Sequence, residues 1–265
     1  MAHPNFLLNS RILIIGGSSG LGFATASGAL ANGSKVHITS VTPEKLSKKM
    51  GELQALYPDS HVSGSAADLY NPQAMEGMLQ TILDAAVKET GGPLDHLVWT
   101  AGDERLILPL GQMTAEFAMN SFTLRYIGPL LMGKLVSANP GKYLKVAASS
   151  SITLTSGIMA HRPLPGVIAA AAGAIEVLTR SLAVELAPIR ANVIIPGTVN
   201  TELLHNAVAQ NPHLASMEDM FKKASLTKLL GTPESAAEAY LFCMRCALAT
   251  GQSFTVDNGY LMSQG

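Results

Sequence analysis

Apolar runs alternate with amphipathic stretches along the whole chain, and no linker or repeat interrupts them. This pattern is typical of successive strand and helix units that build one parallel sheet with helices on both faces. The predicted strands are short apolar runs at 11–15, 35–40, 61–64, 94–99, 152–155, 191–195 and 253–256. The predicted helices cover 21–31, 43–56, 72–89, 114–136 and 167–186, with one more after Pro233. We therefore predict an α/β fold, a doubly wound parallel sheet in a single domain over 1–265.

Two segments depart from this alternation. Residues 139–149 show no clear period and are predicted to form an irregular surface segment. Residues 203–230 mix Met, Phe, Lys and His at helical spacing. We expect this second segment to cover a substrate pocket as a lid, and a fixed pair of surface helices is an equal alternative.

Composition narrows the classes of partner. Hydrophobic residues make up 48% of the chain and charged residues 14%, which favours burial of surface between subunits. The net charge of −1 and the absence of a basic run argue against nucleic acid or an anionic membrane as a partner. No stretch reaches the roughly 20 apolar residues of a membrane span, and no targeting pattern opens the chain, so a cytoplasmic protein is expected.

The two cysteines, Cys243 and Cys246, have the spacing of a redox pair or half of a zinc site. They lie within the predicted helix after Pro233, where this spacing places two small side chains on one face. The chain has no second pair of ligands of this kind, so we expect neither a metal site nor a redox centre.

The clearest motif is a glycine-rich turn, Gly16-Gly17-Ser18-Ser19-Gly20-Leu21-Gly22, between the first strand and the first helix. Glycines in this position let the backbone approach a pyrophosphate, whose charge is stabilised by the free amides at the helix start. The motif therefore predicts a dinucleotide site.

The turn resembles the TGxxxGxG motif of the short-chain dehydrogenase/reductase family, with Ile15 where threonine is usual. Four later stretches add to this resemblance, which covers essentially the whole chain and implies a Rossmann-type fold. They are the adenine-contacting pair Asp68-Leu69, the NNAG-like Thr100-Ala101-Gly102, the PG segment at 196–201 and the VDGG-like segment at 256–259.

The catalytic positions of that family are substituted here. Residues 179–188 resemble the helix that follows the family's YxxxK motif, and counting back places Ile168 at the tyrosine and Ala172 at the lysine. Neither side chain can transfer a proton. By the same resemblance the family's asparagine corresponds to Arg125 and its serine to Ser156.

The end of the second strand, Ser40-Val41-Thr42 with Lys45 nearby, bears on the choice of cofactor. Relatives that use NAD carry an acidic residue there, whereas neutral hydroxyls and a lysine would accept a ribose phosphate. The sequence favours NADP(H), although Ser40 and Thr42 could serve only to cap the following helix. The predicted cofactor contacts are Gly16, Ser18, Ser19, Gly20, Leu21, Gly22, Ser40, Thr42, Lys45, Asp68, Leu69, Thr100, Ala101, Gly102, Arg125, Pro196, Gly197, Val199 and Thr201.

The candidate catalytic residues are Arg125, Asp103, Ser156 and His161. Arg125 cannot act as an acid but could hold a carbonyl, a carboxylate or the cofactor, and solvation at the surface is the alternative. Asp103 follows a strand end where such sheets bind ligands, and it could equally be a solvated loop carboxylate. His161 belongs to the residue type best suited to proton transfer near neutral pH, but a lone loop histidine is more often structural.

Because it lacks the tyrosine and the lysine, the chain resembles the tetrad-deficient reductases and cyclases of fungal alkaloid pathways. This resemblance implies an NADPH-dependent reductase acting on an imine or iminium, in which cyclisation can accompany reduction. Those relatives use a loop aspartate, whereas the corresponding loop here, 161–166, contains no carboxylate. The alternatives are a cyclase or isomerase without net redox chemistry, and a regulatory protein that only binds the cofactor.

The helix over 167–186 begins with a run of small residues at 169–173, which allows another helix to approach closely. In the family that the chain resembles, this helix packs against its own copy. A homodimer or homotetramer is therefore expected.

Overall fold

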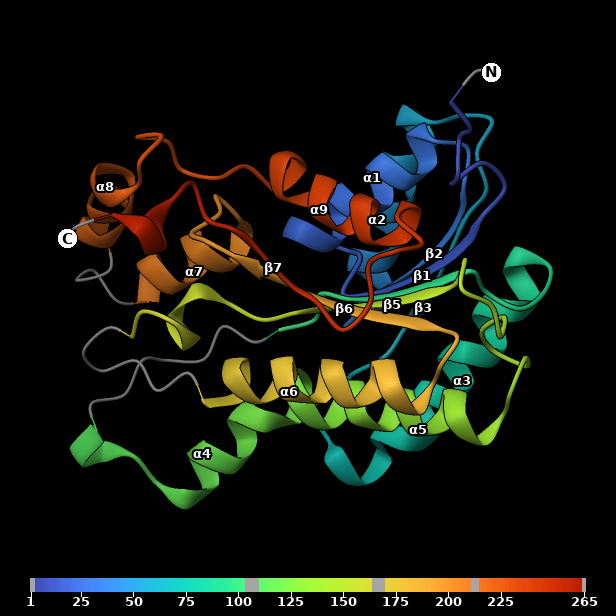
Figure 1. Ribbon diagram of the computed structural model, residues 1–265, viewed down its shortest axis with the longest axis horizontal. Coiled ribbons are helices and arrows are strands. Elements are labelled where there is room, and N and C mark those ends of the chain that lie inside the picture. Colours follow the sequence, from blue (N-terminus) through green and yellow to red (C-terminus); the bar gives the residue numbers. More distant parts are fainter. Residues whose placement is uncertain (1–2, 103–109, 164–169, 211–214, 264–265) are drawn as a thin grey trace.

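The fold is described here from a computed structural model over residues 3–102, 110–163, 170–210 and 215–263. Its centre is one parallel sheet with the strand order β3-β2-β1-β4-β5-β6-β7 (Figure 1). The strands are β1 Arg11–Ile15, β2 Lys35–Ser40, β3 Val62–Ala66, β4 His96–Trp99, β5 Ser151–Thr155, β6 Arg190–Pro196 and β7 Ser253–Val256. The predicted Rossmann-type α/β fold is confirmed.

Helices cover both faces of this sheet (Figure 1). One face carries α1 (Gly20–Ala31), α2 (Pro43–Leu56) and α9 (Pro233–Arg245). The other carries α3 (Pro72–Thr90), α5 (Gly128–Ala138) and α6 (Ala170–Glu185). Because both faces are covered, nearly every side chain of the central strands β1, β4, β5 and β6 is buried.

The predicted helix over 114–136 is interrupted. It consists of α4 (Ala115–Phe122), a π-helical turn (Thr123–Ile127) and α5, which follow one another directly. A π-helical turn inserts an extra residue into a helix and often occurs at a functional site. This turn carries Arg125.

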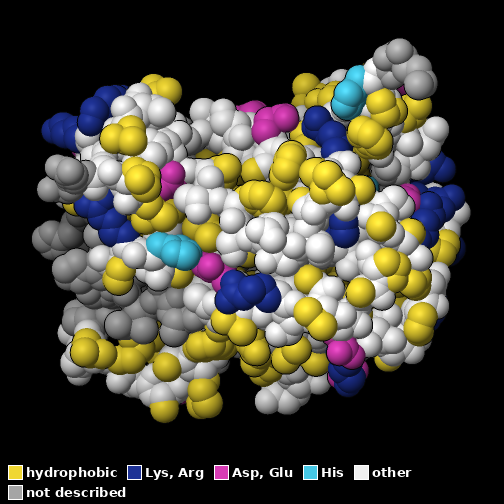
Figure 2. Space-filling view, in the orientation of Figure 1, with side chains coloured by type: hydrophobic (Ala, Val, Ile, Leu, Met, Phe, Trp, Pro, Cys, Tyr) yellow, Lys and Arg dark blue, Asp and Glu magenta, His cyan; other side chains and the backbone are white. Residues whose placement is uncertain are grey.

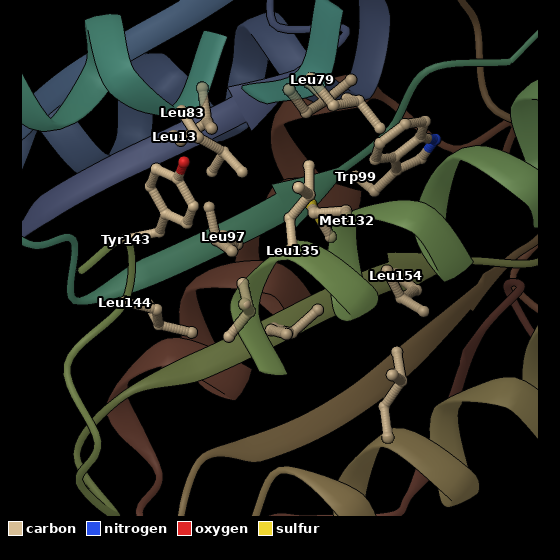
Figure 3. Packing of buried hydrophobic residues seen from close by; sticks show 14 of the residues in the cluster. Leu13, Leu79, Leu83, Leu97, Trp99, Met132, Leu135, Tyr143, Leu144 and Leu154 are labelled. Atoms are coloured by element: carbon tan, nitrogen blue, oxygen red, sulfur yellow. The ribbon is translucent and has the colours of Figure 1, made fainter. Parts of the chain in front are cut away.

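The segment over 139–149 forms neither helix nor strand, as predicted, but it is not confined to the surface. Tyr143 and Leu144 are buried in the hydrophobic cluster between the sheet and α3, α5 and α6, where they lie near Leu13, Leu97 and Leu135 (Figure 3). The prediction of a surface segment is wrong at these two residues, because long-range packing buries them.

The segment over 203–230 contains two helices, α7 (Glu202–Gln210) and α8 (Ala215–Ala224). They lie at the same end of the molecule as α4 (left in Figure 1). Two single 3-10 turns also lie near this end, Ile158–Ala160 after β5 and Tyr260–Met262 near the carboxyl terminus. The role of α7 and α8 as a lid stays a prediction.

Candidate functional site

The turn between β1 and α1 packs tightly against the end of β4. Gly16 has a φ of +86°, and a Cβ atom there would lie 2.6 Å from the amide nitrogen of Ala101. A Cβ atom on Gly22 would lie 2.2 Å from the carbonyl oxygen of Gly16. Both positions therefore require glycine. This packing leaves a cradle of glycine backbone at the start of α1, of the kind that holds a pyrophosphate.

The start of α1 favours an anion. Ser19 is the N-cap residue, yet its side chain makes no hydrogen bond to the first amides of the helix. The first turn also contains no acidic residue. Unpaired amides and the positive end of the helix dipole both stabilise a phosphate at such a place. Ser18 is buried beside it, and Leu21 is half-buried.

The Thr100-Ala101-Gly102 segment completes this side of the cradle. The Thr100 hydroxyl lies 3.1 Å from the carbonyl oxygen of Ile15, to which it donates. The amide of Ala101 donates to the same carbonyl at 3.0 Å. These bonds tie the end of β4 to the end of β1, so the two motifs that the sequence singled out separately form one surface.

The end of β2 supplies a buried hydroxyl that lacks a partner. Ser40 is 4% exposed, and its Oγ has no hydrogen-bond partner among the residues described. Thr42 instead caps α2, since its hydroxyl accepts a hydrogen bond from the Lys45 amide at 3.2 Å. The capping alternative therefore holds for Thr42 but not for Ser40. An unpaired buried hydroxyl at this strand end fits a ribose or its phosphate.

Lys45 reaches across to the segment predicted as a lid. Its Nζ lies 3.1 Å from Oε2 of Glu202, the first residue of α7, and Nζ of Lys49 lies 3.9 Å from Oε1. Both ends of the Lys45 pair are largely exposed. The pair joins the proposed ribose-phosphate region to α7, although exposed pairs of this kind contribute little to stability.

Of the two residues predicted to contact the adenine, Asp68 is exposed and Leu69 is buried. Leu69 packs in the core, so only its backbone can face a ligand. Asp68 is exposed, and its Oδ1 accepts a hydrogen bond from the Tyr70 amide at 2.9 Å. The Asp68 carboxylate is therefore the polar side chain available at this strand end.

The 196–201 segment closes the cradle from the opposite side. The Gly197 amide donates to Val256 at 3.0 Å, and a Cβ atom on Gly197 would lie 2.7 Å from Cα of Asp257. Thr201 stands beside the glycine turn, since a Cβ atom on Gly20 would lie 3.1 Å from its Cγ2. The remaining predicted contacts of this segment, Pro196 and Val199, are buried.

Arg125 projects from the π-helical turn to the end of β4. A Cβ atom on Gly102 would lie 3.0 Å from its Nη2. The guanidinium thus covers the glycine that ends the Thr100-Ala101-Gly102 segment, beside the cradle and not out in bulk solvent. The companion candidate Asp103 and the tyrosine position Ile168 lie outside the described residues.

Ser156 and His161 meet at a carboxylate that the sequence analysis missed. The Ser156 hydroxyl lies 2.8 Å from the carbonyl oxygen of Ala172 and 3.1 Å from Oε1 of Glu176. The same Oε1 lies 2.8 Å from Nε2 of His161. His161 is therefore not a lone loop histidine. Its partner comes from α6, one turn beyond Ala172 at the position matched to the family's lysine.

A sequence signal for Glu176 existed. Glu176 is a charged residue within the otherwise apolar stretch 170–178, the first half of the helix. In the structure it faces inward, with 8% of its surface exposed. Charged residues are rarely buried unless they are paired. Glu176 therefore brings a carboxylate from α6 to His161.

Comparison with known proteins agrees with this geometry. The family model described as an SDR-like Rossmann domain matches residues 3–263. The chain belongs to the short-chain dehydrogenase/reductase family. It is therefore an oxidoreductase of the short-chain type, and its cradle corresponds to the dinucleotide-binding half of such enzymes.

Fungal members of the family are similar over nearly the whole chain. Short-chain dehydrogenase/reductase ATR9 of Stachybotrys chlorohalonatus is 41% identical over 251 residues, which cover 94% of this chain and 95% of the relative. Short-chain dehydrogenase/reductase malC of Malbranchea aurantiaca is 33% identical over 264 residues, 97% of each chain. The solved structure of the MalC reductase/Diels-Alderase from the same organism superposes with a TM-score of 0.89 at 33% identity, covering 97% of this chain and 98% of that one.

The two cysteines lie at the end of α9, one of them buried. Cys243 is buried in α9, and burial raises the pKa of its thiol to about 12. A thiol held in its protonated form is a poor metal ligand and a poor nucleophile. Within 3–102, 110–163, 170–210 and 215–263, no cluster of three or more His, Cys, Asp or Glu is arranged to hold a metal ion.

Two surface findings bear on partners. On the face shown in Figure 2, Lys and Arg side chains are scattered among hydrophobic ones and form no single basic patch. In the described part of the chain, no helix is both long and apolar enough to cross a membrane.

Proposed function

We propose that this short-chain oxidoreductase binds NADP(H) and reduces an activated C=N bond, an imine or iminium, in fungal secondary metabolism. One observation carries the proposal. The dinucleotide cradle of Gly16, Gly22 and Thr100 is complete, whereas the position matched to the catalytic lysine is Ala172. An enzyme so built keeps hydride transfer but lacks the usual route for protonating a ketone's developing alkoxide.

The residues present fit a phosphorylated dinucleotide. The cradle fits a pyrophosphate, the buried Ser40 hydroxyl at the end of β2 is unpaired among the residues described, and Lys45 lies in the first turn of the helix that follows. When bound, the reduced nicotinamide supplies a hydride. The chain's own residues then bind and orient the acceptor, a task for which Arg125 lies next to the end of β4.

The experiment is a fluorescence titration with NADPH and NADH, followed by measurement of NADPH consumption with a cyclic iminium salt. We expect tighter binding of NADPH and turnover of the iminium but not of simple ketones. Gly22→Ala should abolish binding, because its Cβ would lie 2.2 Å from the Gly16 carbonyl oxygen. Gly77→Ala in α3 is the matched control, since nothing lies within 4 Å of that added carbon. Tighter binding of NADH, or efficient ketone reduction, would contradict the proposal.

A second candidate is a cyclase that retains NADP(H) as part of the pocket wall. The Malbranchea relative described as a reductase and Diels-Alderase favours this possibility, since it is 33% identical over 97% of the chain. Consumption of NADPH during product formation distinguishes reduction from cyclisation alone. Tight NADPH binding without turnover of any substrate would instead favour a regulatory binding protein.

A further inference from the structure

Glu176 is a buried carboxylate whose two contacts come from different parts of the chain. Its Oε1 lies 3.1 Å from the Ser156 hydroxyl at the end of β5 and 2.8 Å from Nε2 of His161 after the 3-10 turn. A carboxylate with 8% exposure is costly unless it is hydrogen-bonded or paired. The three side chains therefore hold one another in place.

The group formed by Ser156, His161 and Glu176 lies where the family's usual members carry a catalyst. The Ser156 hydroxyl also lies 2.8 Å from the carbonyl oxygen of Ala172, the residue matched to the missing lysine. Ser156 directly follows β5, at the carboxyl edge of the sheet where parallel α/β folds bind their ligands. The group thus lies against the turn of α6 that carries a catalyst in the family's usual members.

We propose that His161 transfers a proton to the substrate nitrogen, and that Glu176 is the residue that positions it. This inference rests on the proposed function and names its substrate as a neutral imine. Nε2 of the ring faces Glu176, and Nδ1 has no hydrogen-bond partner among the residues described. The Glu176 carboxylate, 2.8 Å from Nε2, fixes the orientation of the ring. The His161 side chain is 41% exposed, so part of the ring is open to solvent, and the proposal assigns the substrate contact to Nδ1.

The proton and the electrons balance as follows. The Nδ1–H bond of the imidazolium breaks, an N–H bond forms on the imine, and the substrate becomes an iminium. Its carbon then accepts a hydride from the reduced nicotinamide, and the C=N π pair moves to nitrogen to give an amine. His161 is left neutral and regains its proton from water.

The other charged group next to His161 in the sequence is engaged elsewhere. Nη1 of Arg162 donates to the carbonyl oxygen of Tyr260 at 2.9 Å and to that of Ser263 at 3.2 Å, and its guanidinium lies over the Tyr260 ring. Glu176 is therefore the charged partner that the described residues give to the His161 ring.

The test compares two substrates that differ in the need for a proton and in one N-methyl group. In buffer above the pKa of its conjugate acid, methylpyrroline is a neutral imine, whereas its N-methylated salt is an iminium that needs no proton. We expect His161→Asn to reduce the imine about 100-fold more slowly than the unaltered protein, while turnover of the salt changes less than about threefold. His61→Asn is the control, because His61 is an exposed histidine distant from His161 in the sequence.

Glu176→Gln tests the positioning role while keeping the side chain's shape. We expect kcat for the imine to fall about tenfold with KM unchanged, and turnover of the salt to be retained. Glu185→Gln, an exposed glutamate on the same helix, is the control. His161→Gln provides a second variant that can still donate to Glu176, should His161→Asn fail to fold.

Each outcome decides the matter. Selective loss of imine reduction in the His161 and Glu176 variants supports the inference. Unchanged imine reduction, or equal loss on both substrates, overturns it and leaves the proposed function standing. If the unaltered protein consumes NADPH with neither substrate, the proposed function fails, and the inference falls with it.

Discussion

Arg125 lies in the π-helical turn between α4 and α5, at the position that the sequence resemblance matches to the family's asparagine. Its guanidinium reaches the end of β4, where a Cβ atom on Gly102 would lie 3.0 Å from Nη2. A permanent charge here can orient an acceptor or the cofactor but cannot donate a proton in catalysis. If the substrate is a neutral imine, as proposed, another group has to supply its proton, and the His161–Glu176 pair lies beyond the end of β5, the strand next to β4.

Replacing Arg125 with alanine should lower turnover about 100-fold, if its oriented charge contacts the reacting groups. The thermal midpoint should change little, because the side chain is only half-buried. Steady-state kinetics and thermal unfolding measure the two effects. Arg180→Ala, an exposed arginine on α6, is the control. Turnover near that of the unaltered protein would remove Arg125 from the site.

Buried histidines illustrate a different role for the same residue type. His37 lies between two serines, its ring nitrogens each 2.9 Å from the hydroxyl of Ser63 or Ser65. Burial, with a smaller contribution from the charge of His61, lowers the pKa of His37 from 6.5 to about 4. Burial likewise lowers the pKa of His96 to about 3. Both rings are neutral in the folded protein at neutral pH and serve its structure.

These two pKa values predict a loss of stability in acid. Below 6.5 the unfolded chain binds protons that the folded chain excludes, so the free energy of unfolding falls as the pH drops from 6.5 towards about 4. Each histidine contributes a slope of at most about 1.4 kcal/mol per pH unit. Urea unfolding across this range should show a shallower slope for His37→Gln than for the exposed control His3→Asn. Equal slopes would contradict the prediction.

At the scale of elements, α2 and α7 are joined by the exposed ion pair of Lys45 and Glu202. The same lysine is the candidate contact for a ribose phosphate, so the phosphate and the Glu202 carboxylate would compete for it. An exposed pair contributes at most about 1 kcal/mol, which a phosphate can readily displace. The helix predicted to discriminate between the cofactors is thereby linked to the predicted lid.

Lys45→Ala should weaken NADPH binding about tenfold and leave NADH binding unchanged, because only NADPH carries the extra phosphate. Glu202→Gln should strengthen NADPH binding, since it removes the competing carboxylate. Fluorescence titration measures both effects. Lys48→Ala is the matched control, as Lys48 is exposed on the same helix. Equal weakening of NADH binding by Lys45→Ala would show that the lysine does not contact the phosphate.

For the whole molecule, the outer surface of α6 is the candidate contact between subunits. Val177 and Val184 on this helix are 57% and 80% exposed. They are separated by two helical turns and so lie on one side of it. Apolar side chains aligned in this way favour burial against a second copy, and the homodimer or homotetramer stays a prediction.

Val184→Glu should therefore shift the protein towards monomer, because it places a charge in an apolar contact. Light scattering at about micromolar concentration measures the mass of the assembly. We expect the unaltered protein to remain associated at that concentration. Val146→Glu, at an exposed position on another segment, should leave the mass unchanged. A monomeric unaltered protein would count against the assembly.

Local patterns in the sequence determined the elements and the cofactor motif of this protein. The predicted bounds of β1, β2, α2 and β7 coincide with those of the structure, because short apolar runs are bounded there by turn and capping residues. The glycine turn could be recognised for the same reason, since one contiguous segment contains all of it. Such signals depend on residues a few positions apart.

The tertiary structure alone decided which distant residues meet. It joined Lys45 to Glu202 across 157 positions, buried Tyr143 and Leu144 from an irregular segment, and placed Glu176 between Ser156 and His161. None of these contacts follows from a local period, because each depends on how whole elements pack against the sheet. The cradle could thus be predicted from sequence, whereas the candidate proton-transfer group arose only when β5, the following turn and α6 came together.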